Sequence, residues 1–294
     1  MLWAILAVMS AIVYAVSNII DRFQVTKQFK RHFNLIAITV VVSGVISLAL
    51  IPFSSYSGLG TMQIVLGFIT GALVIPTLLM YYKALKIEEV STVVGIWAVE
   101  PIFVLVLAFV FLGESFGPLK YAGVFLITIG AVLLQLRVTK ARFGMAFWLM
   151  LGAAVFEAVE IILLKYLLGF AGFTTIFSLT RFGMFAIGLP ILILSIGDIT
   201  KVIKKKGLQP LGMAVVGEIL GISAAFLFVV AISVGYATLV TALAYTQPLF
   251  VLVMAALVGY FFPKIIDERV SRKLLAQRLI SMALIIIGGI IVAL

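Results

Sequence analysis

The sequence has no cysteine, a single histidine and few charged residues. The lack of cysteine excludes disulfides and thiolate chemistry. Charged residues form 11% of the 294 positions, whereas a soluble domain has about 25%. The one histidine, His32, lies in a basic segment, and the sequence contains no HExxH, GxSxG, Asp-rich or ATP-binding motif. We therefore expect no catalytic residues, no metal site and no cofactor.

Long apolar runs take the place of the missing charge. Hydrophobic residues make up 64% of the chain, in runs near the 20 residues or so that cross about 30 Å of hydrocarbon as a helix. This pattern predicts an all-α polytopic membrane protein with ten transmembrane helices. The expected spans are 2–20, 34–52, 61–82, 91–112, 119–136, 144–166, 173–196, 209–232, 237–261 and 275–293.

The two halves of the chain repeat one another. Glu100-Pro101 aligns with Gln247-Pro248, and Asn18 aligns with Glu160. We therefore predict two five-helix repeats, at 1–138 and 143–294. Because five is odd, the second repeat must be inverted in the membrane. Inverted repeats are typical of secondary transporters, which bind substrate near the bilayer midplane.

The placement of basic residues supports inversion. The net charge is +10, and most basic residues lie in the odd-numbered loops between spans. Where a loop of one half is basic, the equivalent loop of the other half is not. Positive loops face the cytoplasm, so we expect both termini outside. This distribution explains the charge without nucleic acid. The simplest location is a prokaryotic plasma (inner) membrane.

The first half contains a set of short motifs: Ala84-Leu85, Pro101, Leu112-Gly113-Glu114, Gly123, Gly130 and the first-span segment VYAVSN at 13–18. Together these motifs resemble the EamA-type repeat of the drug/metabolite transporter superfamily. The second half keeps Pro248 but has Gly259-Tyr260-Phe261 in place of Leu-Gly-Glu. The resemblance implies a ten-helix carrier of small metabolites or xenobiotics that works by alternating access. Family members usually have both termini inside, which the charge pattern contradicts.

Ionisable residues within the predicted spans are the strongest candidates for function, because each is costly in lipid. Glu160 and Arg181 lie at similar depths in neighbouring spans and are expected to form a structural ion pair. Pro101 and Pro248 each remove a backbone hydrogen bond and predict a helix break, and paired breaks mark transporter sites. The predicted substrate- or proton-binding residues are Glu100, Glu157, Glu218, Gln247, Trp97, Tyr245, Tyr14 and Asn18.

These residues favour a secondary transporter of an amino acid, an amine or a similar zwitterionic or cationic solute. A carboxyl group removed from water beside other carboxyl groups exchanges its proton near neutral pH, so H⁺-coupled export is the mechanistic hypothesis. The sequence leaves two alternatives open: an intramembrane enzyme on a lipid-linked substrate, and a non-transporting sensor or assembly subunit. The expected partners are a small-molecule substrate, protons and the lipid bilayer, and both monomer and homodimer remain open.

Overall fold

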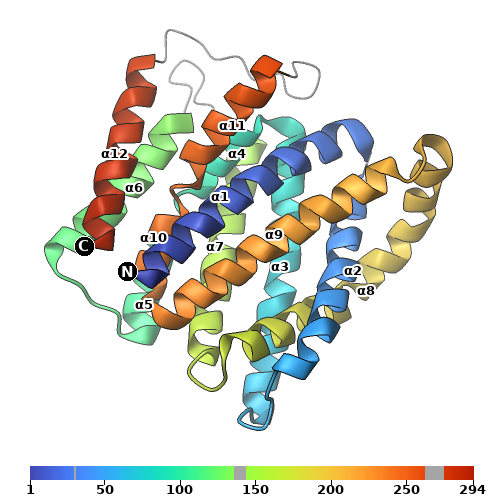
Figure 1. Ribbon diagram of the computed structural model, residues 1–294, viewed down its shortest axis with the longest axis horizontal. Helices are drawn as coiled ribbons and strands as arrows, with labels where there is room; N and C mark the ends of the chain where they lie inside the picture. Colours follow the sequence, from blue (N-terminus) through green and yellow to red (C-terminus); the bar gives the residue numbers. More distant parts are fainter. Residues whose placement is uncertain (30, 136–143, 262–274) are drawn as a thin grey trace.

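The computed structural model describes residues 1–29, 31–135, 144–261 and 275–294 (Figure 1). The basic segments 136–143 and 262–274, which include most of the loop predicted before the last span, lie outside the described residues. Within the described residues every element is helical, as predicted. The main helices are α1 Leu2–Phe23, α2 Phe33–Leu50, α3 Thr61–Ile87, α4 Val90–Trp97, α5 Glu100–Leu112, α6 Pro118–Gln135, α7 Met145–Leu167, α8 Phe173–Lys206, α9 Gln209–Val234, α10 Ala237–Ala244, α11 Gln247–Phe261 and α12 Leu275–Ala293.

These helices are long and apolar enough to cross a membrane. In the part of the chain that the structure describes, nine helical segments meet that standard, with α4–α5 and α10–α11 each contributing one segment. The apolar helix at Pro118–Leu134, at the place of the fifth predicted span, is shorter than that standard. Their arrangement supports the predicted polytopic membrane protein.

Several helices are longer than the sequence predicted, among them α3, which continues past residue 82 to Ile87. The first helix continues past residue 20 to Phe23 and then into a π-helix at Gln24–Gln28. The seventh predicted span, 173–196, extends as α8 to Lys206. It ends at Gly207, whose positive φ of 76° favours glycine, and its last turn carries three lysines, which stabilise the negative end of the helix dipole.

Two spans are interrupted where proline follows a polar residue. Ala98 and Val99 separate α4 from α5, and Tyr245 and Thr246 separate α10 from α11. Pro101 is in the first turn of α5, where a helix tolerates a missing backbone N–H. Glu100 begins the same helix, so its carboxyl group lies at the positive end of the α5 dipole.

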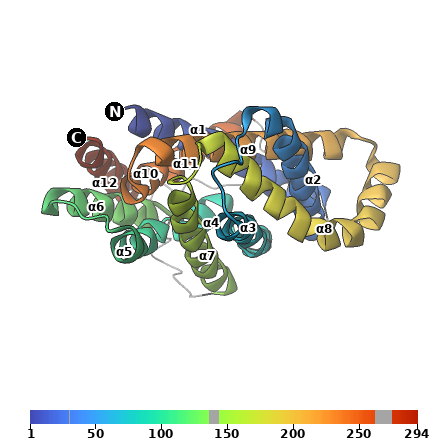
Figure 2. The same cartoon turned by 90° about the horizontal axis from the view of Figure 1, so that it is seen from below.

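Helices from the two halves of the chain pack in pairs. The helix α1 lies along α9, and α3 lies along α7. The pair α2 and α8 forms one end of the molecule, and the pair α6 and α12 forms the other (Figures 1 and 2). The two termini lie near each other in both views. The centre of the molecule, between these end pairs, therefore contains α1, α3, α7, α9 and the two interrupted spans.

Glycine permits the closest helix crossings. A Cβ atom added to Gly71 of α3 would lie 2.0 Å from the carbonyl oxygen of Thr180 in α8. A Cβ added to Gly288 of α12 would lie 2.7 Å from the carbonyl oxygen of Gly123 in α6. No side chain fits at these distances, so both helix pairs depend on glycine for contact between their backbones.

Candidate functional site

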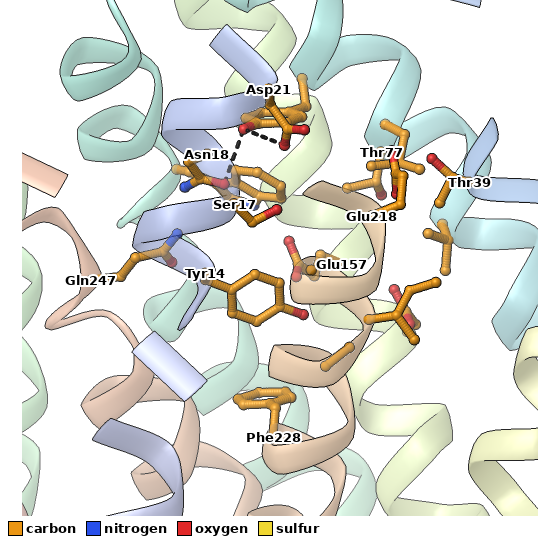
Figure 3. Close-up of a pocket in the computed structure, with 18 of the residues that line it drawn as sticks. Tyr14, Ser17, Asn18, Asp21, Thr39, Thr77, Glu157, Glu218, Phe228 and Gln247 are labelled. Atoms are coloured by element: carbon orange, nitrogen blue, oxygen red, sulfur yellow. Dashed lines mark hydrogen bonds between the residues drawn. The ribbon is translucent and has the colours of Figure 1, made fainter. Parts of the chain in front are cut away.

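A cavity of about 150 Å³ lies at the centre of the molecule (Figure 3). It is lined by helices from both halves of the chain. Its polar and aromatic lining consists of Tyr14, Ser17, Asn18, Asp21, Thr39, Thr77, Tyr81, Tyr82, Trp97, Glu157, Glu160, Arg181, Glu218, Phe228, Tyr245 and Gln247. Every residue predicted to bind substrate or protons is in this set except Glu100.

Glu100 lies behind the cavity wall, where it joins the two interrupted spans. Its side chain is fully buried, and it accepts a hydrogen bond from the hydroxyl group of Tyr245. Glu100 begins α5, whereas Tyr245 stands in the break between α10 and α11. A buried hydrogen bond therefore joins the break in one half of the chain to the break in the other half.

Glu157 lies between Glu100 and the cavity. Its carboxyl group interacts electrostatically with that of Glu100, and Trp97, the last residue of α4, lines the same cavity. Trp97 also packs against Tyr81 of α3, with ring centroids 5.1 Å apart. The α4–α5 break thus brings an aromatic ring and a carboxyl group against a second carboxyl group on α7.

A second pair of carboxyl groups lies between α1 and α9. The hydroxyl group of Tyr81 donates to Asn18 Oδ1 at 3.0 Å and to Asp21 Oδ2 at 3.2 Å. The hydroxyl group of Tyr82 donates to Glu218 Oε1 at 2.9 Å. Asp21 and Glu218 also interact electrostatically. Adjacent tyrosines of α3 therefore each hold one member of an acidic pair.

Asp21 was missed by the sequence reasoning, which ended the first span at residue 20. The helix in fact continues through Asp21, which is 8% exposed. A usable signal was present, because Tyr14, Asn18 and Asp21 follow one another at helical spacing and share a face. Tyr81 and Tyr82 gave no comparable signal, since adjacent tyrosines near a span end are common at membrane interfaces.

Arg181 of α8 is the cation among the cavity-lining residues. Its Nη2 atom lies 3.9 Å from Glu160 Oε1, and its guanidinium group lies 5.0 Å from the centre of the Phe177 ring. Its Nε atom is buried and has no hydrogen-bond partner among the described residues. The pair therefore faces the cavity, and one nitrogen of the guanidinium group is left without a protein partner.

The cavity is acidic and aromatic. Asp21, Glu157, Glu160 and Glu218 line it against the single guanidinium group of Arg181. Removed from water, carboxylates require a cation, a proton or a hydrogen-bond donor. Aromatic rings add attraction for a cation within about 6 Å of a ring face. The site can accordingly hold a cationic group, or protons in its place.

Glu114 and Lys165 lie away from the cavity. The carboxylate of Glu114 accepts hydrogen bonds from the backbone N–H groups of Ala237 and Thr238, at 2.7 and 3.0 Å, and from the Thr238 hydroxyl group at 2.7 Å. Lys165 Nζ donates to the carbonyl oxygens of Ile232 and Gly235 at 2.8 and 2.7 Å. Glu114 thus holds the start of α10 in place, and Lys165 binds carbonyl oxygens at the end of α9.

Comparison with known proteins identifies the first half of the chain. Residues 1–136 match the model of the EamA-like transporter family. This match confirms the resemblance that the sequence motifs indicated. The match is confined to residues 1–136, and the apolar helices of both halves are those of an integral membrane protein.

A likeness of fold covers nearly the whole chain. The alignment with a solved crystal structure covers 98% of this chain and 95% of the chain in that structure, with a TM-score of 0.61 and 17% sequence identity. At that identity the alignment shows a shared fold alone. No curated protein matches the sequence.

Proposed function

We propose that this protein is a secondary transporter that moves a small cationic or zwitterionic solute across the membrane by alternating access. The observation that carries the proposal is the central cavity, with four carboxyl groups, one guanidinium group and several aromatic rings. Sites for drug-sized ligands occupy about 300–1,000 Å³, so a cavity of about 150 Å³ suits a small metabolite.

Helix packing supports two inverted repeats, 1–138 and 143–294. If the repeats are equivalent, α1 corresponds to α7 and α3 to α9. The packing of α1 on α9 is then matched by that of α7 on α3, and the packing of α11 on α1 by that of α5 on α7. Transporters built in this way expose a central site to each side by moving one repeat against the other.

The acidic groups support exchange of the solute for protons. When the solute is absent, protons can neutralise Glu157 and the Asp21–Glu218 pair, and a bound ammonium group replaces them. Glu100 lies one side chain behind Glu157 and contacts Tyr245 in the opposite break. A change in the protonation of Glu100 would therefore alter the contact between the two interrupted spans. We assign H⁺-coupled export as the mechanism.

The basic loops give the proposed orientation, with odd-numbered loops in the cytoplasm of a prokaryotic cell and both termini outside. Accessibility of a terminal tag tests this orientation. Labelling of the tag by a membrane-impermeant reagent in intact cells supports it, and labelling only after the membrane is opened overturns it.

A transport assay tests the function. Amino acids, polyamines and quaternary amines are screened for a thermal shift, and the strongest ligand is then followed by radiolabelled counterflow in proteoliposomes. We expect counterflow that Glu157→Gln and Glu218→Gln abolish. Glu88→Gln is the matched control, because Glu88 is exposed and does not line the cavity. Binding without counterflow would favour a sensor, and chemical conversion of the ligand would favour an enzyme.

A further inference from the structure

A second pocket, of about 520 Å³, lies at one end of the molecule between the chain after α1 and the end of α8. Five of its residues are basic. Its lining includes Lys27, Arg31, Lys201, Lys205, Lys206 and the single acid Asp198. This pocket shares no residue with the central cavity, and the proposed transport function does not use it.

Contacts within this pocket leave an excess of positive charge. Asp198 is shared between Arg31, at 3.1 Å, and Lys201, at 3.4 Å. Lys206 Nζ donates to the backbone carbonyl oxygens of Lys27 and Gln28, at 2.9 and 3.3 Å, and fixes the two walls together. One carboxylate cannot neutralise the five cations, so the pocket is built to receive an anion.

The position of the pocket matches the surface of the bilayer. The hydroxyl group of Ser195 donates to the carbonyl oxygen of Phe33, so the start of α2 is level with Ser195 of α8. The helix α8 continues for eleven more residues to Lys206, a rise of about 16 Å. The basic residues of α8 therefore begin just beyond the level at which α2 starts.

An exposed apolar surface leads into the pocket. Ile187 is 53% exposed and Leu194 is 80% exposed. They share one face of α8 with Asp198, Lys201 and Lys205, because these positions recur at helical spacing. A ligand seated on this face contacts cations at one end and exposed apolar side chains below them.

We propose that this pocket binds the phosphate of an anionic phospholipid, whose acyl chains lie along the exposed apolar face of α8. Lipids and free phosphate share the chemistry of the anionic phosphate, but only a lipid uses both the cations and the apolar face. Basic pockets between membrane helices are suited to anionic headgroups. The lipid would bridge the end of α1 and the end of α8, which come from different halves of the chain.

Two adjacent lysines provide a matched test. Lys205 lines the pocket, whereas Lys204 is exposed on the same helix end and does not. The variants K205Q and K204Q remove the same charge and leave the helix intact. Native mass spectrometry of the full-length protein in detergent would measure retention of phosphatidylglycerol, phosphatidylcholine and inorganic phosphate, each added separately.

We expect the wild-type protein to retain phosphatidylglycerol in preference to phosphatidylcholine, and to retain little inorganic phosphate. K205Q should weaken phosphatidylglycerol binding about fivefold, the effect of one cation near a membrane surface, and K204Q should weaken it less than about twofold. Equal losses in the two variants would overturn the site. Equally strong retention of inorganic phosphate would overturn the assignment to lipid.

Discussion

The hydrogen bond from Tyr245 to Glu100 gives the sharpest prediction about how the two interrupted spans are held. Both side chains are buried, and Glu100 has no exposed surface. A hydrogen bond to an ionised group contributes about 1.5–3 kcal/mol, and one between neutral groups contributes about 1 kcal/mol. Tyr245→Phe should therefore lower the free energy of unfolding by an amount that reports the charge on Glu100.

A double-mutant cycle isolates this bond. The free energy of unfolding is measured by dodecyl sulfate titration in mixed micelles for Tyr245→Phe, for Glu100→Met, which has no oxygen to accept the tyrosine hydroxyl group, and for the double variant. A coupling energy of about 1.5–3 kcal/mol indicates an ionised Glu100, and a coupling energy of about 1 kcal/mol indicates a protonated Glu100.

Tyr166→Phe is the control for loss of a tyrosine hydroxyl group, because Tyr166 is 43% exposed. Its effect should stay within about 0.5 kcal/mol. A coupling energy below about 0.3 kcal/mol between Tyr245 and Glu100 would refute the argument that their bond joins the two breaks.

Three further changes test the packing, the α10 anchor and the loop histidine. Gly71→Ala should lower the free energy of unfolding by about 1–3 kcal/mol, because the added Cβ meets the Thr180 carbonyl oxygen. Gly197→Ala is the control, because Gly197 lies in open space on α8. Equal thermal unfolding of the two variants would contradict the close packing of α3 on α8 at Gly71. Glu114→Gln should cost about 1–3 kcal/mol in the same titration, since the amide accepts fewer of the three hydrogen bonds from Ala237 and Thr238; no loss would show that the anchor is dispensable. Burial and the positive charges of Lys86 and Lys83 lower the pKa of His32 from 6.5, so the free energy of unfolding should fall as the pH drops through 6.5. His32→Gln should flatten that dependence, and an unchanged pH profile would remove His32 as its source.

The apolar pattern was sufficient to predict the helices, but not the three-dimensional shape of the site. Runs of about 20 apolar residues and the two prolines located the spans and their interruptions, because span length and proline chemistry act locally. Asp21 was missed because the apolar run ends before its helix does. Glu100 and Glu157 were predicted to have the same role, whereas the structure places Glu157 at the cavity and Glu100 behind it.

That difference arises from packing between distant segments. Tyr81 and Tyr82 became identifiable only when α3 was placed against α1 and α9, where their hydroxyl groups meet Asp21 and Glu218. Arg181 was predicted to form a structural pair with Glu160, and the structure adds that both side chains line the cavity. No local pattern encodes such neighbours, because Tyr81 and Asp21 are 60 positions apart and Tyr82 and Glu218 are 136 positions apart.

Proton release on binding tests the central claim, that a cationic solute replaces protons on the cavity carboxyl groups. The purified protein is titrated with the solute in a calorimeter at about pH 7, in two buffers that differ in ionisation enthalpy. The difference between the two binding enthalpies measures the number of protons exchanged when the solute binds. The account predicts net release from the wild-type protein and from Glu88→Gln, and a smaller release from Glu157→Gln. Binding with no release, or with proton uptake, would contradict it.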